Sequence, residues 1–316
     1  MRRALAYVLI GIGVFALVLA AGLRFYAPSR AEKTPLNLNI TLVSTGPATI
    51  FNAATGQSDQ LNLVATRLVK TDSAKSNSDV TVVQETLCVM RDVDDPPQCG
   101  DNPRDPRIVD ISTDRVAADR KTAESVNDSK YHENVNGDTS VKHVGLSYKW
   151  PFHAKKQTYK FFDPISKQAP DARFIGTEKI GGLNLYKYQA DINNVDLPVD
   201  NAQKIPGKYS DTRIVWVDPV TGVIVKGTEH QVRTFADGAP AADITLTFNK
   251  TAVDYQLKQA KDGRNKINLL TVWLPLIALV LGIVFLVAGV LVLRQQSGPR
   301  AEPPATATSE PPLERV

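Results

Sequence analysis

The sequence predicts a mainly β extracytoplasmic domain, built as an antiparallel curved sheet, sandwich or open barrel, between an N-terminal and a C-terminal transmembrane helix. Residues 4–23 and 269–293 are each apolar enough to cross a bilayer, since a spanning helix needs about 20 such residues. Between them, apolar residues recur at every second position, and glycine-containing turns separate these runs. We therefore expect a cytoplasmic end (1–3), a transmembrane helix (4–23), the domain (24–266), a second transmembrane helix (267–293) and a disordered cytoplasmic tail (294–316).

Alternating residues predict the strands of the first half. Leu36, Leu38, Ile40 and Leu42 alternate with polar residues, and similar runs occupy residues 61–68 and 80–89. The following segment, 100–141, is rich in polar residues. We expect it to form a long surface excursion with one short helix near 113–126.

Hairpin signals become clear in the second half. Gly181 and Gly182 separate two alternating runs, as in a tight two-residue turn, and Asp237-Gly238 separates two more. The paired runs that we expect are 174–180 with 183–188, 213–217 with 223–226, and 230–235 with 242–248. Residues 251–266 then read as a polar helical stem leading into the second membrane helix.

Basic residues predict the orientation in the membrane. Arg2 and Arg3 precede the first apolar stretch, and Arg294 and Arg300 follow the second. The positive-inside rule then places both termini in the cytoplasm and the bulk of a two-pass inner-membrane protein outside. Four cations before the second stretch oppose this, but long translocated domains largely escape the rule. A cleaved signal peptide is the alternative for the first stretch.

Two cysteines occur, Cys88 and Cys99, and both fall in the presumed exported domain. We expect a disulfide, which would stabilise the fold by about 3 kcal/mol in the chain-entropy model. Free thiols or metal ligands are the alternatives. The usual zinc spacings are missing, and a nearby group of aspartates lacks the spacing of a standard calcium loop, so no metal site is expected.

Catalytic patterns are missing from the sequence. It has no glycine-framed serine, His-Glu-x-x-His, phosphate loop or dinucleotide glycine pattern. We therefore predict a protein that is not an enzyme and needs no cofactor, with a hydrolase as a minor alternative. The net charge of +4, without a basic block interleaved with aromatics, argues against a nucleic-acid partner.

The densest unusual feature is a stretch of aromatic residues with interspersed lysines. Aromatic walls with a few cations suit a lipid or glycolipid with an acyl chain and a polar head. The alternative is a core strand pair with solvated lysines. The lipid-binding residues expected on the first interpretation are Tyr148, Trp150, Phe152, Lys156, Tyr159, Phe161 and Phe162.

Several segments, in their order, resemble the actinobacterial Porin PorA membrane protein family. They are the two terminal helices, the Tyr148-x-Trp150-Pro151-Phe152 and Tyr159-x-Phe161-Phe162-Asp163 segments, the Phe174-x-Gly176-x-Glu178 strand with its turn to Tyr186-x-Tyr188, and the Trp216-Val217-Asp218-Pro219 hairpin. The resemblance implies a cell-envelope protein. Its mycobacterial relatives handle trehalose-linked mycolate glycolipids in the periplasm, together with a large mycolate-exporting membrane transporter.

Together these features lead us to expect a membrane-anchored periplasmic protein that binds a lipid or glycolipid and assists envelope lipid transport. A non-enzymatic scaffold or partner subunit of an envelope complex is the second hypothesis. A pore-forming protein is not expected, because the two spanning stretches are uniformly apolar and carry no polar stripe to line a lumen.

Overall fold

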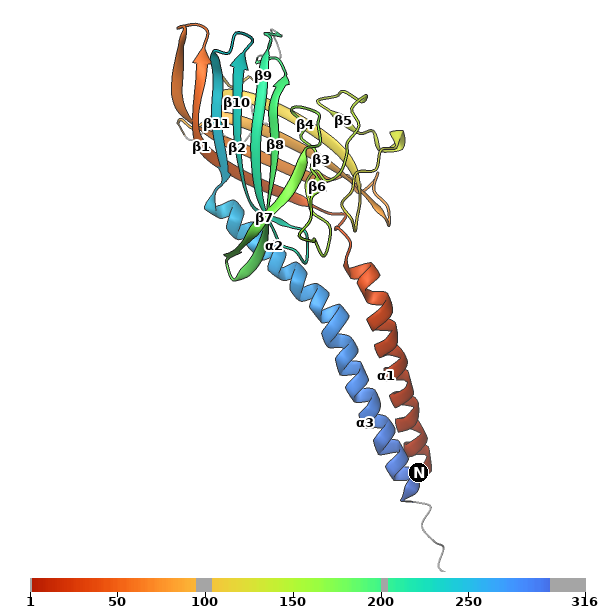
Figure 1. Ribbon diagram of the computed structural model, residues 1–316. Helices are drawn as coiled ribbons and strands as arrows, with labels where there is room; N and C mark the ends of the chain where they lie inside the picture. The colour runs from red at the N-terminus through yellow and green to blue at the C-terminus, as the bar shows by residue number, and fades with distance from the viewer. Residues whose placement is uncertain (1, 95–103, 200–203, 296–316) are drawn as a thin grey trace, which may run out of the picture. The chain divides into compact units, whose positions relative to one another are not determined.

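The computed structural model describes residues 2–94, 104–199 and 204–295, and it divides into two compact units (Figure 1). One unit comprises Met1–Pro28 and Leu269–Val316, and the other comprises Ser29–Asn268. The first contains most of α1 (Arg2–Ala31), the π-helical turn η2 (Leu269–Trp273) and α3 (Leu274–Arg294). The second contains the strands and helix α2 (Lys250–Asn268). The predicted boundaries of the membrane spans and of the tail stay predictions.

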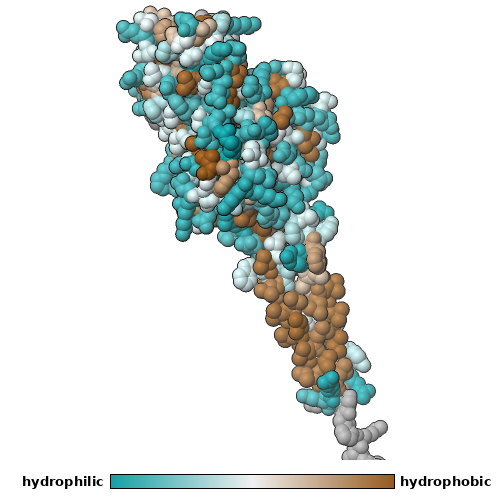
Figure 2. All heavy atoms as spheres, viewed as in Figure 1, coloured by the Kyte–Doolittle hydropathy of each residue, from teal (hydrophilic) through white to brown (hydrophobic). Residues whose placement is uncertain are grey.

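The first unit is a pair of apolar helices. Both are long and apolar enough to cross a membrane by length and composition. Figure 2 shows that their outward surface is hydrophobic, whereas the second unit presents a mostly hydrophilic face. Pro275 stands at the start of α3, directly after the π-helical turn η2, where its missing backbone N–H costs little.

Small residues at seven-residue spacing bring α1 and α3 together. Ala6 and Ala20 on α1 are 0% and 6% exposed, and Gly13 lies midway between them. On α3 the buried glycines are Gly282 and Gly289. A Cβ atom added at Gly282 would lie 3.1 Å from the Gly13 carbonyl oxygen. The seven-residue repeat places the small residues on one face of each helix, so the two backbones pack closely.

The second unit contains one 11-stranded sheet in which every pair of neighbours is antiparallel. Its order is β5-β4-β3-β2-β1-β11-β10-β9-β8-β7-β6. The predicted mainly antiparallel β fold with terminal apolar helices is therefore confirmed. The strands are β1 (Asn39–Asn52), β2 (Gln57–Thr71), β3 (Val80–Arg91), β4 (Ile108–Asp119), β5 (Asn134–Val135), β6 (Tyr159–Lys160), β7 (Asp171–Ile180), β8 (Leu183–Asp196), β9 (Gly207–Val217), β10 (Ile224–Phe235) and β11 (Pro240–Phe248).

The sheet curls strongly, as Figure 1 shows. Strands β3 and β9 are separated by four other strands in the sheet, yet residues of both line the same cavity. The sheet is therefore an open barrel, with the short strands β5 and β6 at its two edges. Helix α2 packs Leu257 and Ala260 against Leu185, Trp216 and Val225 on the sheet.

The predicted hairpins are present. Gly181 and Gly182 join β7 to β8 with φ angles of 56° and 87°, the left-handed conformations that a tight hairpin turn requires. The predicted runs 61–68 and 80–89 lie within β2 and β3, and the predicted helical stem lies within α2.

Two predictions for segment 100–141 are wrong. The helix expected near 113–126 is not formed, because residues up to Asp119 belong to β4, which pairs with β3. Val116, Ala117 and Ala118 are buried there. The segment is also not a pure surface excursion, since Val135 is 1% exposed. The polar residues of β4, which hid its strand pattern in the sequence, are spread along the strand. Two of them, Asp110 and Asp114, line the cavity of the domain.

The glycine contacts of the helix pair can be tested by substitution. Gly13→Leu should separate α1 from α3, because an added Cβ would lie 2.9 Å from the Gly282 carbonyl oxygen. Gly11→Leu is the matched control, since nothing lies within 4 Å of a Cβ built there. Spin labels at the outward-facing residues Val14 and Val284 report the separation of the two helices as an electron–electron distance. We expect a longer distance with Gly13→Leu only; equal distances in both backgrounds would contradict the helix pairing.

Candidate functional site

The curled sheet encloses a cavity of about 660 Å³. Its walls come from strands β1 to β4 on one side and β9 to β11 on the other, and loop residues close it, among them Ser147, Tyr148, Pro164 and Ile165. A volume of this size is in the range of small-molecule binding sites. The cavity is therefore the candidate functional site of the domain.

Charged residues enter the cavity at strand positions that are otherwise apolar. On β2, Arg67 shares one face with Ala65 and Val69, and on β3, Glu85 shares one face with Val83 and Leu87, because side chains alternate along a strand. Arg67 and Glu85 form an ion pair, and their side chains are 28% and 13% exposed. Burial raises the pKa of the Glu85 carboxyl, and the charge of Arg67 only partly offsets this.

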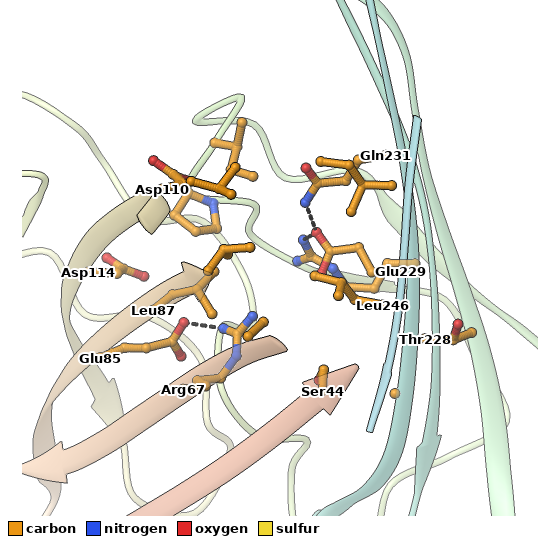
Figure 3. A pocket seen from close by; sticks show the side chains of 18 of the residues that line it. Ser44, Arg67, Glu85, Leu87, Asp110, Asp114, Thr228, Glu229, Gln231 and Leu246 are labelled. Atoms are coloured by element: carbon orange, nitrogen blue, oxygen red, sulfur yellow. Dashed lines mark hydrogen bonds and ion pairs between the residues drawn. The ribbon is translucent and has the colours of Figure 1, made fainter. Parts of the chain in front are cut away.

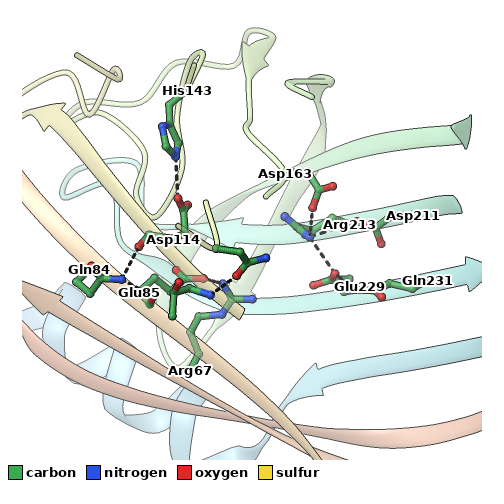
Figure 4. A network of polar contacts seen from close by, with 12 residues as sticks. Arg67, Gln84, Glu85, Asp114, His143, Asp163, Asp211, Arg213, Glu229 and Gln231 are labelled. Carbon is green, nitrogen blue, oxygen red and sulfur yellow. Dashed lines mark hydrogen bonds and ion pairs between the residues drawn. The ribbon is translucent and has the colours of Figure 1, made fainter. Parts of the chain in front are cut away.

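Arg213 is the centre of a second charged group on the opposite wall. Its guanidinium lies 2.9 Å from a Glu229 carboxylate oxygen, 3.1 Å from Asp163 and 3.4 Å from Asp211 (Figure 4). Burial opposes the charge of Arg213, but Glu229, Asp211 and Asp163 outweigh it and raise its pKa. Gln231 donates a further hydrogen bond to Glu229. One cation thus holds three carboxylates together inside the domain.

Two of the three acidic partners of Arg213 have pKa values shifted in opposite directions. Burial raises the pKa of Asp211 to about 8, and the negative charge of Glu229 adds to this effect. Burial also disfavours the charged form of Glu229, but Arg213 and Arg67 outweigh it and hold its pKa below the ordinary value. Near neutral pH the group therefore contains an ionised Glu229 beside a largely protonated Asp211.

Asp114 and His143 form the third polar group. His143 lies 2.7 Å from an Asp114 carboxylate oxygen through Nε2 and is fully buried. Its ring contacts Phe162 with centroids 4.5 Å apart. Because Asp114 lines the cavity, it connects the loop containing His143 to the cavity wall.

This arrangement is suited to binding. Several of its charged groups are tied in ion pairs, much of the remaining wall is aliphatic and aromatic, and it can hold a solute by charge and apolar contact. Within the described residues, no group of three or more His, Cys, Asp or Glu side chains could hold a metal ion.

The predicted aromatic residues split between the cavity and a solid core. Tyr148, Phe161 and Phe162 line the cavity. Trp150 is fully buried and packs against Phe161 and Tyr188, with ring centroids 4.8 and 5.3 Å apart. Tyr159 packs against this core, and the cations contact rings as well, Lys149 over Phe152 at 3.8 Å and Lys156 over Phe174 at 5.6 Å. Trp150, Phe152, Lys156 and Tyr159 are thus not among the cavity-lining residues.

The disulfide prediction is only half covered by the described residues. Cys88 lies on β3, is 1% exposed and is not a free thiol. Cys99, its predicted partner, lies outside the described residues. The pairing of Cys88 with Cys99 stays a prediction.

The charged residues of the cavity were missed from sequence, although the sequence contains a signal for them. A single charge interrupts the apolar face of a strand, as Arg67 does between Ala65 and Val69. Arg213 precedes Val215 and Val217 at the same spacing. Such a charge must face either a partner or a hollow, because an unpaired buried charge is costly.

Comparison with known proteins gives one consistent family. Residues 5–291 match the family described as Porin PorA. A Porin PorA of Corynebacterium amycolatum is 25% identical over 256 residues, which cover 60% of this chain and 66% of the relative. A Porin PorA of Corynebacterium resistens is 22% identical over 284 residues, which cover 61% of this chain and 69% of the relative. The chain thus spans about two thirds of the length of these relatives.

These names overturn the expected function. A lipid-binding protein that assists lipid transport does not agree with relatives named as porins, and pore formation, which the sequence argument set aside, fits better. The error has a physical source. A pore was not expected because the two spanning stretches carry no polar stripe, whereas channels also contain apolar constrictions that gate by dewetting.

The charged group around Arg213 should be essential for stability. Arg213→Met would leave Asp163, Asp211 and Glu229 without their common counter-charge, at an expected cost of about 3–5 kcal/mol. The control is Arg173→Met, which removes the exposed pair with Asp191 and should cost at most about 1 kcal/mol. Urea unfolding of the full chain in a non-ionic detergent measures both. Equal losses would show that Arg213 does not hold the interior together.

Buried Lys149 should make stability depend on pH. It is 9% exposed, and burial lowers its pKa to about 7, although Asp218 partly offsets this. Between pH 7 and about 10.5 the unfolded chain therefore holds a proton at Lys149 that the folded chain lacks, so stability should rise with pH. Lys149→Met should remove this component, and thermal unfolding at pH 6 to 10 checks it. Parallel curves for the two proteins would refute the assignment.

Proposed function

We propose, because this chain belongs to the Porin PorA family, that it forms a pore as an assembly of several copies in the cell envelope. The observation that carries the proposal is the family match over residues 5–291, supported by two relatives that are both named porins. The apolar helices support its placement as a membrane protein of the envelope. The family also favours a non-enzymatic activity over catalysis.

The helix pair determines how such a pore is built. The small residues along α1 and α3 bring the two backbones into contact, so one pair leaves no lumen between its own helices. The outward residues are apolar, among them Phe15, Val18, Val280 and Val287. A conducting path therefore requires helix pairs from several copies, with an apolar wall that wets and dewets as the pore opens and closes.

The proposed topology follows the charge pattern of the sequence. The two helices cross the inner membrane, both termini face the cytoplasm, and the sheet domain stands outside. The domain then presents its cavity on the extracytoplasmic side. Association with a mycolate-exporting transporter, which the family resemblance implies, stays a prediction.

Planar-bilayer recording tests the proposal. Purified full-length protein should produce discrete conductance steps, and their frequency should rise more steeply than linearly with protein concentration, because several copies assemble. Gly13→Leu should reduce the frequency at least tenfold, whereas Gly11→Leu should not. A mock purification from cells with an empty vector controls for host channels. Inserted, folded protein without conductance would refute pore formation, and a strictly linear dependence would refute assembly.

A further inference from the structure

Arg233 differs from the other arginines on the described wall of the cavity. Arg67 and Arg213 each form an ion pair with a carboxylate of a neighbouring strand. Arg233 forms no ion pair with any residue that the structure describes, and its buried Nε has no hydrogen-bond partner. Its guanidinium lies 5.7 Å from the Tyr209 ring centroid, which provides only a cation–π contact. A partly buried cation without a counter-charge is costly, so Arg233 favours the arrival of an anion.

The acidic residues around Arg233 are weak counter-charges. Asp110 lies on the opposite side of the cavity from Gln231, which is two residues before Arg233 on β10 (Figure 3). Burial raises the pKa of Asp110, and the charge of Arg233 only partly offsets this. Burial also raises the pKa of Asp211 on β9 to about 8. The ionised carboxylate of Glu229 belongs to a residue four positions away, which is about 13 Å along the strand.

The other unpartnered polar atoms of the wall can donate as well. Among the described residues that line the cavity, the buried polar atoms without a hydrogen-bond partner are Arg233 Nε, Arg213 Nε, Ser147 Oγ and Tyr148 OH. An arginine N–H can only donate, and a hydroxyl can donate or accept. These atoms therefore favour a ligand that carries acceptor oxygens, and Arg233 adds the positive charge that selects an anion.

Apolar side chains lie beside Arg233 on the same face of the sheet. Ala242 on β11 is opposite Arg233, and Ile50 on β1 is opposite Ala242. Because opposite residues of paired strands point to the same face, these three side chains lie side by side, and all three line the cavity. Phe235, two residues further along β10, also lines it, and its ring packs edge-to-face on Phe51 with centroids 5.3 Å apart. The wall next to Arg233 can thus cover the apolar body of a ligand.

We propose that the cavity binds a compact apolar molecule with a carboxylate group, the carboxylate at Arg233 and the apolar body against Ile50, Ala242 and Phe235. The planar fork of a guanidinium matches the two oxygens of a carboxylate, and a volume of about 660 Å³ suits a compact body. This inference goes beyond pore formation and does not depend on it, because the cavity lies within the sheet domain alone.

Three probes that share a ring separate charge from apolar burial. Benzoate, benzamide and benzylammonium differ mainly in charge, and titration calorimetry of the full chain in a non-ionic detergent at pH 7.5 measures each. We expect benzoate to bind at least tenfold more tightly than the other two, and rising salt to weaken it. Equal affinity for benzamide, tighter binding of benzylammonium, or no binding of benzoate would each overturn the proposal.

Substitutions locate the carboxylate within the cavity. Arg233→Met should weaken benzoate binding at least tenfold, and Arg233→Lys should give an intermediate loss, because it keeps the charge without the fork. Arg173→Met removes an exposed arginine of β7 and should leave the affinity unchanged. Asp110→Asn should strengthen binding about two- to threefold, because it removes a carboxyl that acts on Arg233.

Thermal unfolding of each variant shows whether the domain is folded. If Arg233→Met does not fold, Arg233→Lys and Asp110→Asn decide the question. Unchanged affinity in a folded Arg233 variant, weaker binding with Asp110→Asn, or an equal loss with Arg173→Met would refute this site. Bilayer conductance is measured separately, so failure of the carboxylate site and failure of pore formation are distinguishable.

Discussion

The sheet domain depends on a single constraint: charges on the inner face of a curled sheet must find partners inside it. Arg67 meets Glu85 on the neighbouring strand of one wall, Arg213 meets Glu229 on the neighbouring strand of the other, and the charge of Arg67 also lowers the pKa of Glu229. Apolar side chains alone would favour closer packing of the two walls. Ion pairs resist it, because bringing carboxylates closer in a dry interior raises the cost of their charge. Buried ion pairs on the two walls therefore favour a hollow over a closed apolar core.

The sequence predicted local structure well where apolar and polar residues alternate without interruption. The alternating residues of β2 and β3 and the Gly181-Gly182 turn identify strands and a hairpin without tertiary information. The prediction failed at β4, because Asp110 and Asp114 add charges to an alternating strand and make it read as a polar segment. The sequence left a curved sheet, a sandwich and an open barrel as alternatives, since the strands that face one another across the cavity are distant in both sequence and sheet order.

The candidate site shows the same limit. Aromatic composition did indicate a buried region, and Phe161 and Phe162 do reach the cavity. Composition could not separate them from Trp150, whose ring is enclosed by Phe161 and Tyr188. Whether an inward-pointing ring packs against another ring or lines the cavity depends on which strands and loops lie opposite it in the fold. Arg67 and Glu229 were overlooked because they lie on opposite walls of the cavity and act on each other through their charges. The spacing of residues along one strand does not reveal such an interaction.

The pairing of the first and last long strands has a mechanical consequence. β1 follows α1, β11 precedes α2, and the two are antiparallel neighbours, with Ser44 opposite Phe248 and Ile50 opposite Ala242. The chain therefore enters and leaves the domain at the same end of one ladder. Tension that pulls these two connections apart would break the β1–β11 hydrogen bonds in sequence, starting at the pair Ser44 and Phe248. The β1–β11 pairing can thus open stepwise under tension while β1 stays paired with β2 and β11 with β10.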